Sequence, residues 1–276
     1  MRFVAPQTFR VYSGSPMHPT DVDSPRLPSA LVERLRLVRS VGAITGAGVS
    51  QGSGLPTYRG QGGIYDDPAE GDRTVEALSG PTLAADPDRT WCALAALARK
   101  ACDARPSAAH RALAAIEAAV ERFVLLTQNV DGLHQAAGSR NVIDIHGDIF
   151  ATRCLSCHRG GTLDRDELAA LEAAPRCTRC RGLLRPAVVL FEELLPPDKV
   201  QRMLDEFHRH VPDLVLIAGT SSLFPYITEP VAVARAAGKL TVDVNPEETS
   251  VSTFADYRLR GPADVYLPLL ERALVR

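Results

Sequence analysis

The stretch from Thr127 to Gly147, TQNVDGLHQAAGSRNVIDIHG, constrains the fold of this chain more than any other stretch. It follows an apolar run from Phe123 to Leu126, which predicts a buried parallel strand. A second short apolar run, from Val142 to Ile145, ends at His146. The polar residues that follow the first strand are Gln128, Asn129 and Asp131. Because ligands bind beyond the carboxyl ends of strands in an open α/β sheet, we expect a site at this edge.

Apolar, strand-like runs alternate with helical patterns along most of the chain. Further strands are expected at 41–44, 184–191, 213–218, 240–244 and 256–260. Helices are expected at 29–39, within 88–121 with a break at Arg105-Pro106, at 198–210, up to Ala237, and at 264–275. This alternation predicts an α/β fold with a doubly wound, parallel, Rossmann-like sheet. The strand at 184–191 is expected to return the chain to that sheet after an insertion.

A glycine turn, Gly46-Ala47-Gly48, follows the strand expected at 41–44. Glycine lets the backbone approach a pyrophosphate, and a following helix N-terminus offers free N–H groups. The turn lacks the third glycine of the usual dinucleotide fingerprint, so phosphate binding and a structural tight turn both stay open. The glycine-rich segment 52–72 is expected to be a mobile loop over a site, with Arg59 suited to a phosphate or carboxylate; a plain surface loop is the alternative.

Four of the six cysteines form two Cys-x-x-Cys pairs, with 19 residues between the pairs. The pairs are Cys154 with Cys157 and Cys177 with Cys180. In a protein that stays in a reducing compartment, this spacing favours a tetrahedral Zn²⁺ site over disulfides. Four thiolates leave no coordination position for water, so we expect one structural zinc ion rather than a catalytic one.

The expected domain organisation follows from these features. The Rossmann-like domain takes residues 29–150 and 183–276, and the zinc-binding module takes residues 151–182. The small domain also takes part of 52–105, and residues 1–28 form a loosely ordered arm.

Charge and hydropathy narrow the class of partner. The 31 basic and 33 acidic side chains give a net charge of −2, so no basic excess predicts direct binding to nucleic acid or to an anionic membrane. No apolar run approaches the length of a membrane span, and the N-terminus has no apolar core of signal-peptide length. We therefore expect a cytoplasmic protein, while the oligomeric state stays open.

Taken together, the motifs resemble those of the sirtuin (Sir2) family of NAD-dependent protein deacylases over about residues 38–272. Their order and spacing carry the resemblance, since no single motif would suffice. The motifs are GAGVS at 46–50, GLPTYRG at 54–60, TQNVD at 127–131, HG at 146–147, the two Cys-x-x-Cys pairs, RPAVVLF at 185–191, GTSS at 219–222 and VN at 244–245.

The resemblance implies that NAD lies in a cleft between the sheet domain and the zinc-containing module. It implies that the turn at Ala47 contacts the pyrophosphate and that Asp131, with Val130, holds the nicotinamide carboxamide. The implied cofactor-binding residues are Gly46, Ala47, Gly48, Thr57, Tyr58, Arg59, Gln128, Asn129, Val130, Asp131, Gly219, Thr220, Ser221, Asn245 and Ala263. The implied partner is an acyl-lysine protein or peptide, paired by β-strand addition with Val188, Val189, Leu190 and Phe191.

The activity that the resemblance implies is removal of the acyl group from lysine, with NAD cleaved to nicotinamide and O-acyl-ADP-ribose. The acyl carbonyl oxygen displaces nicotinamide, and a ribose hydroxyl then attacks with help from a base whose pKa lies near 7. His146 matches the family's base, since histidine titrates in that range. Asn129 and Asp131 complete the implied catalytic set.

Three departures from the family pattern bear on the acyl group and the peptide. Thr57 stands where many members of the family have aspartate, and threonine is found there in the branch that includes desuccinylases. That branch reads acidic acyl groups with a Tyr-x-x-Arg pair. Leu94 and Leu97 align with that pair, and an apolar pair cannot neutralise a buried carboxylate. We therefore expect activity on acetyl or longer apolar groups and none on succinyl groups. Glu192 replaces the usual glycine and leaves the peptide preference open.

Other functions can use the same residues. An ADP-ribosyltransferase or an NAD glycohydrolase would keep the NAD site and change the acceptor. A non-catalytic NAD sensor is a third hypothesis, and the intact set of Asn129, Asp131 and His146 speaks against it.

Overall fold

The computed structural model describes residues 25–57, 63, 67–100 and 103–275. Most of the expected N-terminal arm therefore lies outside the described residues, and so do Tyr58 and Arg59. Within the described residues, the main sheet has six parallel strands in the order β3-β2-β1-β7-β8-β9. The strands are β1 (Ser40–Thr45), β2 (Arg122–Thr127), β3 (Val142–Asp144), β7 (Leu214–Ala218), β8 (Leu240–Asn245) and β9 (Tyr257–Arg260). The strand order reverses between β1 and β7, which is the switch point where doubly wound sheets bind ligands.

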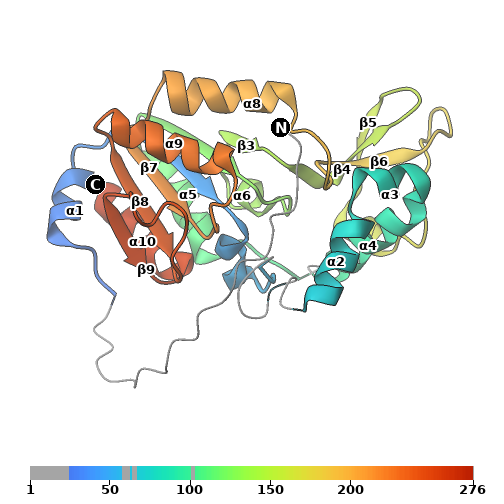
Figure 1. Ribbon diagram of the computed structural model, residues 1–276, viewed down its shortest axis with the longest axis horizontal. Helices are drawn as coiled ribbons and strands as arrows, with labels where there is room; N and C mark the ends of the chain where they lie inside the picture. The colour runs from blue at the N-terminus through green and yellow to red at the C-terminus, as the bar shows by residue number, and fades with distance from the viewer. Residues whose placement is uncertain (1–24, 58–62, 64–66, 101–102, 276) are drawn as a thin grey trace.

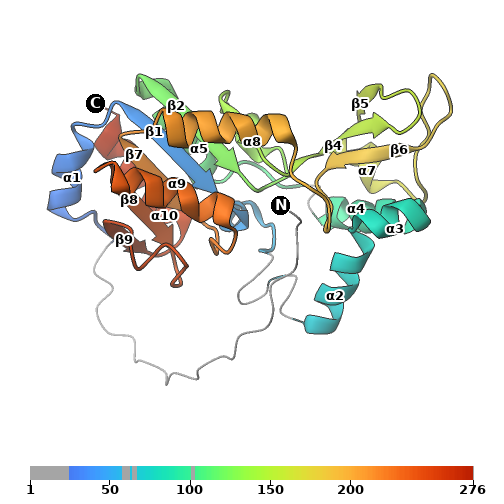
Figure 2. The same ribbon diagram turned by 45° about the horizontal axis from the view of Figure 1, so that its top comes forward.

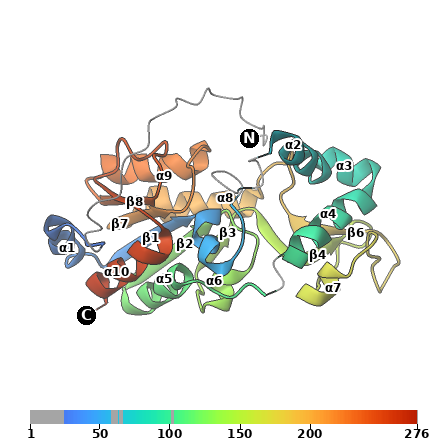
Figure 3. The same cartoon turned by 90° about the horizontal axis from the view of Figure 1, so that it is seen from below.

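Helices cover both faces of this sheet, which confirms the doubly wound prediction. Figure 3 shows α5 and α10 on one side of the sheet and α8 and α9 on the other. One apolar core includes Leu113, Leu125, Leu216 and Leu267, while a second, on the opposite face, includes Phe207. The helices are α1 (Ser29–Leu35), α2 (Pro68–Ala77), α3 (Gly80–Ala85), α4 (Pro87–Lys100), α5 (Ala108–Ala119), α6 (Leu133–Ala136), α7 (Arg165–Ala169), α8 (Pro197–Leu204), α9 (Pro225–Ala236) and α10 (Ala263–Leu274), with a 3-10 helix η1 (Ala47–Ser53) and a π-helix η2 (Asp205–Arg209).

A smaller module lies at one end of the long axis of the molecule (Figures 1 and 2). It has an antiparallel sheet in the order β5-β4-β6, where β4 is Gly147–Cys154, β5 is Gly160–Thr162 and β6 is Leu184–Val188. The expectation that 184–191 returns to the main sheet as a strand is wrong, because β6 pairs with β4. A continuous apolar run predicts a buried strand but does not say which sheet buries it; here α4 and α7 cover it, with Trp91 at the centre.

No helix in the part of the chain that the structure describes is long and apolar enough to cross a membrane.

Candidate active site

The C-terminal ends of β1 and β7 meet through bare backbone. Gly48 N–H donates to the Gly219 carbonyl at 2.8 Å, and Gly46 N–H donates to the Ala218 carbonyl at 3.2 Å. A Cβ on Gly48 would lie 2.6 Å from the Gly219 Cα, and Gly219 itself has a φ of 62°. The glycines are therefore required by the close approach of two chain segments, which supports the structural interpretation of the turn. Phosphate binding at this turn stays a prediction.

Asn129, Ser50 and Asp131 form one chain of hydrogen bonds beyond the end of β2. The Asn129 amide donates to the Gly46 carbonyl and to the Ser50 hydroxyl, each at 3.1 Å. Ser50 donates to Asp131 at 2.7 Å, and the other Asp131 oxygen accepts the Leu133 N–H at 2.9 Å. This network fixes the two predicted polar side chains relative to η1. The sequence motif contained Ser50, but nothing in the spacing assigned it a role.

Polar side chains of β2, β7 and β8 continue along the same edge of the sheet. The Gln128 side-chain amide donates to the Thr220 hydroxyl at 2.7 Å. Asn245 is buried and donates to Asp243. Ser221 is exposed, and Ala263 is buried at the start of α10. The predicted residues from five separate segments thus come to one edge.

His146 lies just beyond β3, with both ring nitrogens engaged. Its Nδ1 lies 2.9 Å from the Gln128 carbonyl, and its Nε2 lies 2.7 Å from the Tyr226 hydroxyl. A carbonyl oxygen can only accept, so Nδ1 carries the proton in the neutral ring and Nε2 keeps the lone pair. Burial is the main cause that lowers the pKa of His146 to about 4, although part of the residue's surface stays exposed. The ring is therefore neutral at pH 7 and can accept a proton at Nε2.

The segment Val188–Phe191 is joined to His146 through the backbone. Val189 N–H donates to the His146 carbonyl at 2.8 Å, and Phe191 N–H donates to the Leu78 carbonyl at 2.9 Å. Gly147 pairs with Val188 and has a φ of 91°, and a Cβ there would lie 2.1 Å from the Ala187 carbonyl oxygen. The segment that the sequence linked to the peptide is therefore hydrogen-bonded to the backbone of His146.

A charged pair fastens the far end of that segment. Arg185 donates to both Glu193 carboxylate oxygens, at 2.9 and 2.8 Å. One of those oxygens also accepts the Leu190 N–H at 3.0 Å, and Arg185 donates to the Val188 carbonyl at 3.0 Å. Glu192, the residue before Glu193, has an exposed side chain. Its φ of 68° lies in the backbone region that favours glycine.

The two leucines expected near the acyl group lie in the apolar core of the small module. Leu94 is 3% exposed, and Leu97 packs against the same cluster, which also contains Val188 and Leu190. Thr57 is half-buried and is the last residue described before position 58. The structure therefore brings Leu94 and the segment 188–190 together in one apolar environment.

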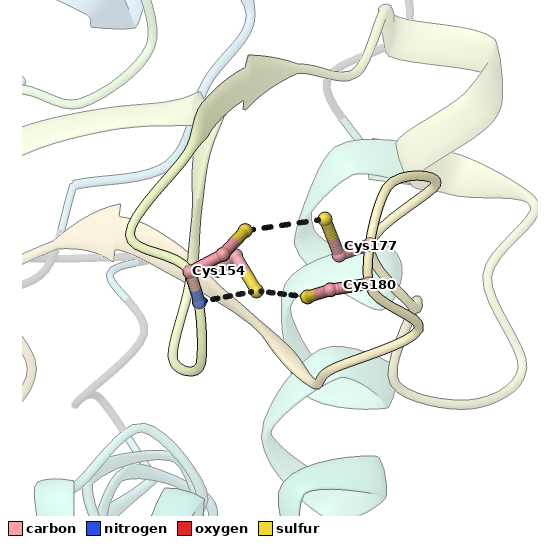
Figure 4. Close-up of side chains that lie close together, drawn as sticks. Cys154, Cys177 and Cys180 are labelled. Carbon is pink, nitrogen blue, oxygen red and sulfur yellow. Dashed lines mark hydrogen bonds between the residues drawn. The ribbon is translucent and has the colours of Figure 1, made fainter.

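The four predicted metal-binding cysteines lie together in the small module (Figure 4). Their sulfur atoms all lie within 4.8 Å of one another, with Cys154 to Cys180 at 3.4 Å and Cys157 to Cys177 at 3.8 Å. Four sulfurs at 2.3 Å from a tetrahedral zinc would be about 3.8 Å apart, so the cluster fits this ion. The Cys157 N–H is the main cause that lowers the pKa of Cys154 to about 6, which favours the thiolate that binds metal.

Two buried histidines behind the site were not assigned a role from the sequence. His110 and His134 lie with their ring centroids 4.6 Å apart, and His134 Nε2 lies 3.0 Å from the Thr45 hydroxyl. His110 Nδ1 accepts the Ser107 N–H at 3.1 Å and so caps α5.

The switch-point edge of the sheet has bare glycine backbone and a neutral imidazole, and it adjoins a module whose four cysteines fit a tetrahedral metal ion. This combination is typical of a nucleotide-using enzyme with a structural metal site. The model of the "Sir2 family" matches residues 46–224 of this chain. The chain belongs to the Sir2 family, and the resemblance found in the sequence is confirmed.

Several known proteins are similar to this chain over most of its length. The "NAD-dependent protein deacylase 2" of Pseudomonas aeruginosa is 41% identical over 252 residues, which cover 90% of this chain and 97% of that protein. A solved "Sir2 homolog-NAD complex" has a TM-score of 0.78 and 35% identity, covering 91% of this chain and 94% of the other. A second structure, "Sir2-p53 peptide-NAD+", has a TM-score of 0.69 and 27% identity, covering 87% and 95%.

Proposed function

We propose that this chain is an NAD-dependent protein-lysine deacylase that acts on acetyl and longer apolar acyl groups and not on succinyl groups. The observation that carries the proposal is the position of His146. Its base nitrogen lies at the switch-point edge of the sheet, and its backbone carbonyl binds Val189 of the segment proposed to pair with the peptide. His146 thus connects the sheet edge proposed to bind NAD to the segment 188–191 proposed to bind the peptide.

The residues present fit NAD. Gly46, Gly48 and Gly219 let the ends of two strands pack closely at the turn, and Gln128, Asn129, Asp131, Thr220 and Asn245 supply hydrogen-bonding side chains. Ala47, Thr57, Val130, Ser221 and Ala263 belong to the same proposed set, while Tyr58 and Arg59 lie outside the described residues. When bound, NAD supplies a ribose carbon whose bond to nicotinamide can be broken, and the hydroxyls of that ribose.

The chain's own residues then have distinct tasks. Asn129 and Asp131 are held by Ser50 and orient the nicotinamide end. His146 accepts a ribose hydroxyl proton at Nε2, and the Gln128 carbonyl stabilises the resulting imidazolium through Nδ1. The four cysteines hold zinc and take no part in the reaction, since their coordination leaves no open position.

The acyl preference is proposed from the apolar surroundings of the segment 188–190. Leu94 and Leu97 pack in the cluster that contains Val188 and Leu190, so an acyl chain delivered there meets hydrocarbon. Transferring an unpaired succinyl carboxylate into such surroundings is costly, whereas an acetyl or longer alkyl chain gains burial. This reasoning also favours deacylation over transfer of ADP-ribose to another acceptor.

The test is a mass-spectrometric assay of the purified protein with NAD and matched acetyl-, succinyl- and long-chain-acyl-lysine peptides. We expect nicotinamide and O-acyl-ADP-ribose only with the two apolar acyl groups, and loss of both products in His146→Ala. Preferred turnover of the succinyl peptide would refute the argument from Leu94 and Leu97. Equal release of nicotinamide and free ADP-ribose without peptide would instead support a glycohydrolase or ADP-ribosyltransferase.

A further inference from the structure

The Nε2 atom of His146 has a hydrogen-bond partner on α9, a helix that the sequence linked neither to NAD nor to the acyl peptide. Tyr226 is in the first turn of α9, and its hydroxyl lies 2.7 Å from His146 Nε2. The two rings meet edge to face, with centroids 6.1 Å apart and an interplanar angle of 80°.

The direction of this hydrogen bond follows from the other side of the ring. Nδ1 must donate to the Gln128 carbonyl, so the neutral ring offers only a lone pair at Nε2. Tyr226 is 7% exposed, and burial raises the pKa of its phenol, so the hydroxyl keeps its proton at pH 7. Tyr226 therefore donates its O–H to the nitrogen that has to accept the ribose proton.

Packing holds Tyr226 in this position. Its ring stacks on Phe224, with centroids 5.5 Å apart and 12° between the planes. It also belongs to the apolar core beneath β3, which includes Ile143 and Ile145, the strand residues that lead to His146. A buried tyrosine hydroxyl needs a hydrogen-bond partner, and the imidazole of His146 is that partner here.

We propose that Tyr226 is a positioning residue that occupies Nε2 of His146 in the ligand-free enzyme and has to release it to the NAD ribose for reaction. This rests on the proposed function of His146 as the base. In the step itself the ribose O–H bond breaks and an N–H bond forms at Nε2. Tyr226 keeps its own proton throughout. Productive NAD binding therefore has to break this hydrogen bond. The free-energy cost of breaking it depends on Tyr226 and not on the basicity of His146.

The test compares Tyr226→Phe with the wild-type protein. The substitution keeps the ring and its stacking on Phe224 and removes only the donor. Because a net hydrogen bond corresponds to about threefold to tenfold in an equilibrium constant, we expect KM for NAD to fall by about that factor, with kcat unchanged or higher. Tyr257→Phe, which alters a tyrosine of β9, is the matched control and should leave both constants unchanged.

A second readout does not depend on activity. In ¹⁵N NMR spectra of the histidine rings, Nδ1 of His146 should stay protonated in both proteins. The Nε2 resonance should move toward that of a nitrogen without a hydrogen bond only in Tyr226→Phe. Phe224→Leu keeps the hydroxyl but loosens the ring, and we expect it to lower KM in the same direction. It serves as the second variant if Tyr226→Phe folds poorly.

The outcomes separate the two proposals. A lower kcat with an unchanged KM in Tyr226→Phe would overturn the inference, because the hydroxyl would then assist the reaction rather than compete with the ribose. An unchanged Nε2 resonance would also overturn it. If His146→Ala kept full deacylation, the proposed base would fail, while the NMR readout would still report whether Tyr226 binds Nε2.

Discussion

At the scale of single residues, Ser50 connects two of the polar side chains that define the site. It accepts from the Asn129 amide and donates to Asp131, so Ser50→Ala leaves both groups short of one partner. We expect kcat/KM for NAD to fall by about tenfold to a hundredfold, since a hydrogen bond to a charged group is worth about 1.5–3 kcal/mol. Ser53→Ala is the matched control, because its buried hydroxyl lacks a partner among the described residues. Equal losses in the two variants would contradict this role.

The buried histidine pair predicts a pH dependence of stability. Burial is the main cause that lowers the pKa of both His110 and His134, and both side chains are at most 1% exposed. In the unfolded chain both titrate near pH 6.5, so below that pH the unfolded state binds more protons. The stability they contribute is complete above pH 6.5 and is lost as the pH falls.

We expect these two histidines to lower the free energy of unfolding in urea by up to about 2.7 kcal/mol per pH unit below pH 6.5, at about 1.4 for each. Burial lowers the pKa of His146 as well, so that residue adds to the slope in the same direction. His134→Gln should reduce this slope, whereas His210→Gln, which changes an exposed histidine, should not. A slope that is the same in all three proteins would show that other groups cause the acid sensitivity.

The sequence could identify those site residues that lie directly after a predicted strand. Gln128, Asn129 and His146 follow β2 and β3 directly, so the strand pattern placed them. Ser50 and Tyr226 could not be assigned in this way, because their partners lie about 80 residues away along the chain. Sequence spacing says nothing about such contacts until the packing of the elements is known.

At the scale of elements, the turn after β6 depends on the pair formed by Arg185 and Glu193. Glu193→Gln removes the negative charge of a carboxylate that accepts two hydrogen bonds from Arg185 and one from the Leu190 N–H. The side chains are 24% and 23% exposed, so we expect a loss of about 1–2 kcal/mol in stability after allowing for solvent, together with a higher KM for the acyl peptide. Glu192→Gln, beside it, should change neither urea unfolding nor KM. An unchanged peptide KM in Glu193→Gln would show that the pair does not support the peptide segment.

At Glu192, next to Glu193, the left-handed backbone predicts a substitution that stabilises the protein. A non-glycine residue at a φ of 68° carries a cost of about 1–2 kcal/mol that glycine does not, offset in part by the greater freedom of glycine in the unfolded chain. We therefore expect Glu192→Gly to raise the urea midpoint by the equivalent of about 0.5–1 kcal/mol. A lower midpoint would mean that contacts of the glutamate outweigh the strain.

The strands β1, β2 and β7 were predictable because each contains a continuous apolar run bounded by polar or glycine residues. The placement of 184–191 was wrong because β6 is equally apolar, yet it is buried by α4 and α7 rather than by the helices of the main sheet. Apolar character alone therefore does not decide between two sheets in one chain. We propose that the boundary of the small module extends beyond 151–182 to include β4 and β6.

At the scale of the whole molecule, β4 links the two bodies. It begins at Gly147, directly after the imidazole, and ends at Cys154 in the cysteine cluster. Removing zinc should therefore release the strand that positions His146 as well as the module itself. We expect one zinc per chain in the native protein, and loss of both zinc and deacylation in Cys177→Ser or after prolonged chelation.

The main sheet has its own two apolar cores, so its strands should survive this loss. Hydrogen exchange should show the amides of β7 and β8 still protected while those of β4 and β6 exchange quickly. Cys92→Ser is the matched control, since Cys92 contacts the Glu172 carbonyl and lies outside the cluster, and it should keep zinc and activity. Activity that persists without zinc would show that β4 does not depend on the metal. Activity that changed with the identity of the bound metal would mean that the metal takes part in the reaction, which four thiolate ligands are expected to prevent.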